Sequence, residues 1–192
     1  MASVYVNRPG IGKRLAIKRV RQMVNRIEPF LTEGDRVLDL GAGMCLYTYE
    51  LRQKGFQVTP VDIKNRSIVS SVTPILYDGE TLPYPNNAFD TCLLVAVLHH
   101  TKNPEKILSE TARVSRKLIV RENIYTNTIQ KYYTYCIDSI LNKEFRGHPH
   151  TNKTDASWKK MFTHLGLRLE KVEYSHTWGY MLDGTYYLTR SN

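Results

Sequence analysis

The sequence predicts an α/β protein built on a doubly wound, mostly parallel β-sheet. Short apolar runs alternate with helical patterns through the first two-thirds of the chain, and a glycine-rich turn joins the first strand to a helix. A length of 192 residues with 42% hydrophobic residues is enough to bury one core. We therefore expect a single domain over residues 1–192, with a basic N-terminal helix in 1–35 and a helical lid with a His-rich loop in 126–164.

The N-terminal segment is predicted to be an amphipathic, basic helix. From Lys13 to Leu31, apolar residues recur at helical spacing with basic residues between them. The formal net charge of the chain is +9. A basic surface attracts nucleic acid, anionic lipid or acidic metabolites. An apolar stripe packed on the sheet, with solvated charges around it, explains the same pattern.

The middle of the chain alternates strand and helix. Gly55 ends the first helix after the glycine turn, and Asn103-Pro104-Glu105 supplies an N-cap, a first-position proline and an acid for the next. The run at 65–73 is too short for a full crossover helix. The expected strands are 36–40, 57–63, 74–77, 89–98 and 117–120, and the expected helices are 45–54 and 103–114.

The last third is expected to hold a tyrosine-rich helix over 126–145, a loop over 147–152 and a helix over 155–164 that Asp155 caps. Pro149 lacks an amide hydrogen and biases His148 toward extended geometry, so the first helix cannot continue through it. Two alternating segments, 167–174 and 185–189, predict strands that add an antiparallel edge to the sheet.

The turn Gly41-Ala42-Gly43 is the sequence feature that indicates a ligand-binding site. It follows an apolar strand, opens a helix, and precedes Asp62 by 62 − 43 = 19 residues. An acid at that distance ends the neighbouring strand and can accept hydrogen bonds from a ribose diol. The third glycine of a dinucleotide fingerprint falls at Leu46, so close helix approach to a diphosphate is not provided for. The pattern favours a nucleoside ligand without a diphosphate.

Four successive motifs resemble those of the class I S-adenosylmethionine-dependent methyltransferases, and most closely the type 11 group. They are Val37 to Gly43, Val61-Asp62-Ile63, Tyr77 to Tyr84, and Phe89-Asp90 through His100. The resemblance covers about Arg36 to Tyr125 and implies a Rossmann-like sheet of seven strands with an antiparallel edge strand. It also implies S-adenosylmethionine as the cofactor.

The resemblance assigns roles to matching positions. Asp39 and the glycine turn line the methionine part of the donor, Asp62 holds the ribose, and Ile63 packs on adenine. Asp78-Gly79 meets the adenine edge, although a plain turn explains this pair as well. The implied cofactor-binding residues are Asp39, Gly41, Ala42, Gly43, Asp62, Ile63, Asp78, Gly79, Leu94 and Val95. Cys45 stands where many members of the family have glycine.

Methyl transfer requires mainly that the acceptor be positioned and its proton steered. The candidate catalytic residues are His100, His148 and Glu122, and the candidate acceptor contacts are His99, Tyr125, Tyr133 and His150. Histidine titrates near neutral pH, but hydrogen bonding within the loop also explains the His99-His100 pair. No metal site is predicted, although His148 and His150 leave a metal role open.

The leading hypothesis is methyl transfer to an oxygen, nitrogen or sulfur atom of a small-molecule acceptor, acidic or aromatic. One alternative is an RNA or nucleotide methyltransferase that uses the basic N-terminal helix on phosphates. Another is a non-catalytic donor-binding module that holds a partner protein or an anionic membrane through the same helix. No apolar run is long enough to span a bilayer, and three widely spaced cysteines predict a cytoplasmic protein.

Overall fold

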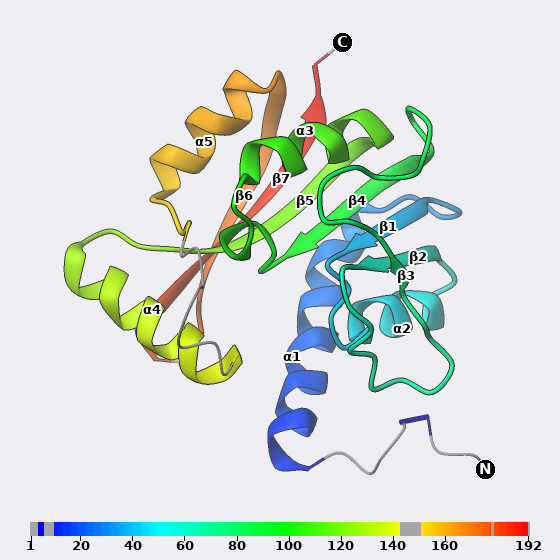
Figure 1. The fold of residues 1–192 in the computed structure, drawn as a ribbon, viewed down its shortest axis with the longest axis horizontal. Helices are drawn as coiled ribbons and strands as arrows, with labels where there is room; N and C mark the ends of the chain where they lie inside the picture. The colour runs from blue at the N-terminus through cyan, green and yellow to red at the C-terminus, as the bar shows by residue number, and fades with distance from the viewer. Residues whose placement is uncertain (1–3, 6–9, 143–150, 178, 192) are drawn as a thin grey trace. The chain divides into compact units, whose positions relative to one another are not determined.

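A computed structural model of the chain describes residues 4–5, 10–142, 151–177 and 179–191. Its seven strands form a mixed sheet in the order β3-β2-β1-β4-β5-β7-β6, with flanking helices (Figure 1). The predicted fold class is therefore confirmed. The chain divides into two compact units, Met1–Leu93 with Arg113–Arg116, and Leu94–Ala112 with Lys117–Asn192. The expectation of one domain over 1–192 stays a prediction.

The first unit opens with a basic helix, α1 (Ile11–Ile27), followed by a 3-10 turn at Glu28–Phe30. Its buried stripe packs against α2 (Leu46–Gln53). The helix ends earlier than the predicted Leu31 because Pro29 cannot donate the next helical hydrogen bond. The buried stripe consists of Ile17, Val20, Met23, Val24 and Ile27.

The first unit also contains three parallel strands: β1 (Arg36–Leu40), β2 (Gln57–Asp62) and β3 (Ile75–Leu76). β1 pairs with β2 from Arg36↔Gln57 to Leu40↔Val61, and β2 pairs with β3. This register brings the carboxyl ends of β1 and β2 together. The segment between β2 and β3 contains no helix, as its length predicted.

β4 (Phe89–Val95) is shorter than the predicted 89–98. Ala96 has φ +54, which ends the strand, and its amide donates to the Arg121 carbonyl at 2.8 Å. A 3-10 turn, η2 (Leu98–His100), follows in place of the predicted strand end. α3 (Pro104–Val114) matches its prediction.

The second unit ends in an antiparallel hairpin that extends the sheet. β5 (Ser115–Ile124) pairs with β7 (Met181–Arg190), and β7 pairs with β6 (Leu167–Thr177). All three strands are longer than predicted, because a long antiparallel ladder satisfies the backbone groups of residues that lack a strand-like pattern.

Two helices accompany the hairpin. α4 (Thr128–Asn142) contacts β7, and α5 (Asp155–His164) packs along β6 (Figure 1). Thr154, not Asp155, caps α5, because its side chain accepts from the Ser157 amide. No helix among the described residues combines the length and apolarity needed to cross a bilayer.

A substitution at Gly184 tests how tightly the hairpin is packed. A Cβ at this position would lie 2.6 Å from Oη and 2.7 Å from Cζ of Tyr186, a fully buried ring whose hydroxyl donates to Asp155 at 2.9 Å. We expect Gly184→Ala to lower the free energy of unfolding by about 1–3 kcal/mol, as overpacked cores do. Urea denaturation measures this, with Gly12→Ala as the control because a Cβ there meets nothing within 4 Å. An unchanged midpoint for Gly184→Ala would contradict the packing described.

Candidate functional site

The glycine turn between β1 and α2 has a backbone that favours glycine. Gly41 and Gly43 have φ values of +71° and +51°, a region that other residues adopt at a cost. The amides of Gly41 and Ala42 both donate to the Val61 carbonyl, at 2.8 and 3.1 Å, so the turn is fixed to the end of β2. Cys45 also has a positive φ, +58°. That conformation explains why glycine is common there in the family that the sequence resembles.

Asp62 contacts this turn directly. One carboxylate oxygen accepts from the Gly43 amide at 2.7 Å and the other accepts from the Lys64 amide at 3.0 Å. The side chain is nearly buried, at 8% exposure. A carboxylate offers about four acceptor positions, so two amide bonds leave room for ligand hydroxyls. The spacing of 19 residues noted in the sequence thus corresponds to a contact in space.

An exposed apolar side chain stands next to Asp62 in sequence. Ile63 is 53% exposed, and a Cβ on Gly79 would lie 3.2 Å from its Cγ2 atom, so the Gly79 backbone closely approaches it. An exposed isoleucine beside a bare backbone is a surface that a flat base can cover. Asp78 uses one oxygen to accept from the Glu80 and Thr81 amides, both at 2.8 Å, which is the turn geometry of the alternative explanation.

Asp39 is buried and binds the start of α2. One of its oxygens accepts from the Thr48 amide at 3.1 Å and from the Thr48 hydroxyl at 2.6 Å. The first amides of a helix lack intrahelical acceptors, and Cys45 offers no side-chain cap, so Asp39 caps α2 from β1. Burial raises the pKa of Asp39 to about 6, and the Thr48 hydrogen bonds lower it only in part.

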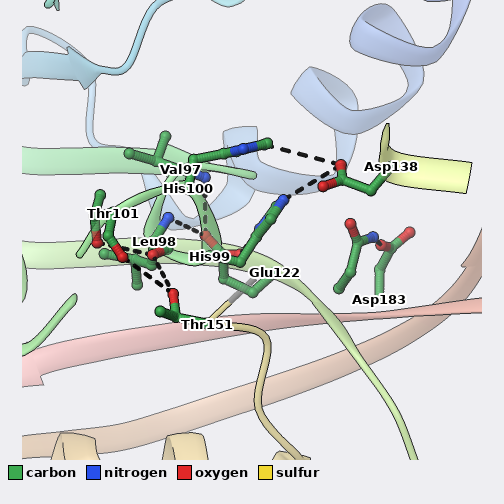
Figure 2. Close-up of polar contacts among 10 residues, drawn as sticks. Val97, Leu98, His99, His100, Thr101, Glu122, Asp138, Thr151 and Asp183 are labelled. Carbon is green, nitrogen blue, oxygen red and sulfur yellow. Dashed lines mark hydrogen bonds and ion pairs between the residues drawn. The ribbon is translucent and has the colours of Figure 1, made fainter. Parts of the chain in front are cut away.

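A second polar cluster lies in the other unit, around Glu122 on β5 (Figure 2). One oxygen of Glu122 accepts from the amides of Val97 and Leu98, at 2.9 and 2.7 Å. The other oxygen lies 2.5 Å from Nδ1 of His99, and both side chains have 0% exposure. Glu122 and His99 are therefore bonded to each other and closed to solvent.

The charge of His99 follows from these neighbours. Burial lowers the pKa of His99, but the Glu122 carboxylate and Asp138 oppose this effect and raise it to about 10. His100, next in the chain, retains 27% side-chain exposure. Among the predicted catalytic and acceptor residues on η2, His100 is thus the one that solvent can reach.

Asp138 on α4 completes this cluster and was not predicted. Its Oδ1 atom lies 3.6 Å from Nε2 of His99 and 3.9 Å from Nε2 of His100, and Figure 2 shows both rings directed toward it. Asp138 is an acid in an apolar helical run, Cys136-Ile137-Asp138, and it is 5% exposed. Buried acids are almost always paired. An acid within the apolar pattern of this helix was therefore the one sequence feature that could have indicated a role for Asp138.

Thr151 ties the following segment to η2. Its amide donates to the His99 carbonyl at 3.2 Å, and its hydroxyl donates to the Leu98 and Thr101 carbonyls at 3.1 and 3.3 Å (Figure 2). The predicted site residues His148 and His150 lie outside the described residues.

The remaining predicted residues occupy other places. Tyr125 is half-buried, with the Lys131 ammonium 5.5 Å from the centre of its ring. Tyr133 meets the ring of Tyr180 edge-on, at 6.0 Å between centroids. Leu94 is fully buried near the end of β4. The roles expected of these residues, and of Val95, stay predictions.

The fold and the glycine turn define a class of protein. A mostly parallel sheet, a positive-φ turn after its first strand and an acid at the end of the next strand are the parts of a Rossmann-like nucleoside-binding protein. The family model described as "Methyltransferase domain" matches residues 38–118. Over this segment the chain is similar to the class I S-adenosylmethionine-dependent methyltransferases of the type 11 group, whose cofactor is S-adenosylmethionine.

Curated relatives match part of the chain. Demethylmenaquinone methyltransferase of Tropheryma whipplei (strain Twist) is 33% identical over 104 residues, which are 48% of this chain and 43% of that protein. The chain thus spans less than half the length of this relative.

Solved structures match nearly all of the chain. Magnesium protoporphyrin IX methyltransferase from Synechocystis PCC 6803, with bound SAH, has a TM-score of 0.65 at 18% identity and covers 94% of this chain and 84% of its own. The cyclase SpnF has a TM-score of 0.69 at 14% identity, with 100% and 87% coverage. At these identities the likeness shows the fold alone.

The raised pKa of Asp39 predicts that the free energy of unfolding depends on pH. The pKa of Asp39 in the folded chain, about 6, lies above its ordinary value of 3.8, so the unfolded chain releases this proton first as pH rises. The stability that protonated Asp39 provides is complete below the unfolded pKa and is lost as pH rises through about 6. We expect the free energy of unfolding to fall by about 2.4 kcal/mol from pH 4 to 7 relative to Asp39→Asn, at 1.36 kcal/mol per pKa unit, because the unfolded carboxyl is already partly deprotonated at pH 4.

Urea denaturation of both proteins across this range measures the difference. Asp90→Asn is a matched control with the opposite slope, because Arg36 lowers the pKa of Asp90. The intact protein should gain stability over Asp90→Asn as pH rises. A constant difference between the intact protein and Asp39→Asn would show that Asp39 is not held in its protonated form.

Proposed function

We propose that this chain transfers the methyl group of S-adenosylmethionine to an oxygen, nitrogen or sulfur atom of a small-molecule acceptor. The observation that carries the proposal is the contact between Asp62 and the Gly43 amide, with Ile63 exposed beside it. A polar acceptor of hydrogen bonds next to an apolar surface suits a ribose joined to a flat base. The residues present therefore fit this cofactor.

In the first unit, the glycine turn and the side chains around it each have a proposed role in binding the cofactor. A Cβ on Gly43 would meet only the Gly41 carbonyl oxygen, at 3.8 Å, so no side chain crowds this position of the turn. In this proposal Asp62 accepts hydrogen bonds from the ribose hydroxyls, and Ile63 covers the base. Asp39 holds α2, and with it the turn, in place. S-adenosylmethionine, when bound, supplies an electrophilic methyl group on a sulfonium. The protein's main contribution is then to position the acceptor.

The second unit is proposed to hold the acceptor. His100 is partly exposed and is the proposed contact to the acceptor, directly or through a bound group. His99 and Glu122 are proposed as positioning residues, because their side chains are bonded to each other and neither is exposed to solvent. In this proposal Glu122 fixes η2 and does not accept a proton from the acceptor.

The names of related proteins suggest the kind of acceptor. Demethylmenaquinone methyltransferase and ajmaline N-methyltransferase of Rauvolfia serpentina, 29% identical over 92 residues, are named for the methylation of demethylmenaquinone and of a nitrogen atom of ajmaline. α4 exposes the ring of Tyr132, which meets Tyr135 edge-on at 6.3 Å. Tyrosine rings bind flat or cationic molecules by stacking and cation–π contact. We propose an aromatic or acidic small molecule as the acceptor.

A second candidate function rests on a basic groove along α1. The groove has a volume of about 480 Å³ and presents three cations, of which Arg21 already pairs with Glu50 at 2.8 Å. Such a surface suits RNA phosphates, or a partner protein or anionic membrane if the domain binds the donor without turnover. The lining residues are Tyr5, Arg14, Ile17, Lys18, Arg21, Gln22 and Asn25.

Donor binding is the first test. Isothermal titration of the full chain with S-adenosylmethionine and S-adenosylhomocysteine should give micromolar affinity. Asp62→Ala should weaken it at least tenfold, about 1.4 kcal/mol, because the ribose hydroxyls lose their acceptor. Asp90→Ala is the matched control, since this carboxylate binds Arg36 instead. Absence of binding by the intact protein would overturn the proposed function.

Turnover distinguishes the candidate functions. We expect release of S-adenosylhomocysteine with a member of a panel of quinols, tetrapyrroles and alkaloid amines, measured by mass spectrometry with isotopically labelled donor. Transfer of label to RNA instead, with affinity that falls steeply as salt rises, would support the nucleic-acid candidate. Donor binding with no labelled product from either class would favour the non-catalytic module.

A further inference from the structure

We propose that His99, His100 and Asp138 bind a divalent transition-metal ion, with Zn²⁺ as the probe that best suits the ligand set. The site has no counterpart in the sequence predictions, since its three side chains come from η2 and α4. It lies entirely within the second unit. It goes beyond the proposed methyl transfer and does not depend on it.

The ligand atoms are close enough to share one ion. One atom from each of the three side chains lies within 4.8 Å of the others. The Nε2 atoms of His99 and His100 lie 3.6 and 3.9 Å from Oδ1 of Asp138. Bonds of about 2.0–2.2 Å in a tetrahedral site place ligand atoms about 3.3 Å apart. Small side-chain movements therefore bring the three atoms to bonding distance.

Glu122 supplies the support that histidine ligands of metals usually have. A metal-bound histidine almost always donates its other ring N–H to a carboxylate or carbonyl. Nδ1 of His99 lies 2.5 Å from the Glu122 carboxylate, so the opposite nitrogen, Nε2, faces Asp138. Glu122 is itself held by the Val97 and Leu98 amides. The Glu122 carboxylate thus holds His99, and His99 would hold the proposed ion. The contact with Glu122 fixes the orientation of the His99 ring before the ion binds.

The ligand types select the class of metal. Two imidazoles and one carboxylate suit Zn²⁺ and its neighbours among the divalent transition metals, whereas Mg²⁺ and Ca²⁺ prefer oxygen ligands. Three protein ligands leave at least one coordination position open, as in catalytic zinc sites. The 27% exposure of the His100 side chain provides a route for the ion. Water, or an oxygen or nitrogen atom of an acceptor, then fills the open position.

A proton is the competing occupant. His99 lies between two carboxylates, Glu122 and Asp138, and needs a positive charge there. Either an imidazolium proton or a metal ion on Nε2 supplies that charge. Measured metal binding decides between them.

The test uses the full chain, stripped of metal with a chelator and titrated calorimetrically with Zn²⁺ at neutral pH. We expect one ion per chain with micromolar or tighter affinity. His100→Ala and Asp138→Asn should each weaken binding at least tenfold, and Glu122→Gln by about 10–100-fold, as loss of such support does elsewhere. Co²⁺ in place of Zn²⁺ should give a visible absorption spectrum that His100→Ala abolishes.

Two controls separate this site from other histidines. His164→Ala removes an exposed histidine that also faces a carboxylate, with Nε2 3.5 Å from Glu105, and should leave Zn²⁺ affinity unchanged. The double variant His148→Ala, His150→Ala should still bind one ion. Binding that persists in both His100→Ala and Asp138→Asn, that only the double variant abolishes, or that the intact chain lacks, would overturn the proposal.

Titration with S-adenosylhomocysteine shows whether the first unit of each variant is folded, and the urea midpoint shows this for the whole chain. His100→Ala changes a partly exposed side chain and Asp138→Asn preserves shape, so both should bind the donor as the intact chain does. Failure of Zn²⁺ binding with donor binding intact refutes the metal site alone. Failure of donor binding in the intact chain refutes the proposed function and leaves the metal result to be judged by itself.

Discussion

The buried carboxylate of Glu122 organises the second unit. It accepts from two consecutive backbone amides after β4 and contacts the ring of His99, so one side chain sets the path of η2 and the orientation of the first histidine. Burying a carboxylate is costly, and charge-assisted hydrogen bonds offset the cost only when every donor is in place. β5 is in turn held by the hairpin, since Glu122 pairs with Gly184. The histidine pair thus depends on strands more than sixty residues further along the chain.

The first unit uses acids in the same manner. Asp39 and Asp62 stand at or near the ends of adjacent parallel strands. Asp39 accepts from the Thr48 amide in the helix that follows β1, and Asp62 accepts from the Gly43 amide in the turn that follows the same strand. Asp39 is buried and caps α2, while Asp62 anchors the glycine turn and lies next to the exposed Ile63. Asp39 therefore serves the architecture, and Asp62 is the acid that we propose binds the ribose. The positive φ of Gly41 and Gly43 makes this arrangement possible.

The family match and the solved structures cover different shares of the chain. The family match covers residues 38–118, which include the glycine turn, Asp62 and η2, but not α4 or the hairpin. Solved structures named as a methyltransferase and as a cyclase share the fold at similar TM-scores. The fold alone thus does not define the acceptor or the reaction.

Features of the fold that have local causes could be predicted from the amino-acid sequence. Glycine turns, helix caps and short apolar runs predicted β1, α3 and α5 closely, and the 19-residue spacing predicted that Asp62 ends the neighbouring strand. Tertiary structure decided the rest: β4 ends at Val95, β6 and β7 form long ladders, and Asp138 meets His99 and His100. His99 and Asp138 are 138 − 99 = 39 residues apart, and no local pattern encodes a contact over that distance. The burial of Glu122 likewise follows from packing, because its place on β5 gives no sign of which amides will surround it.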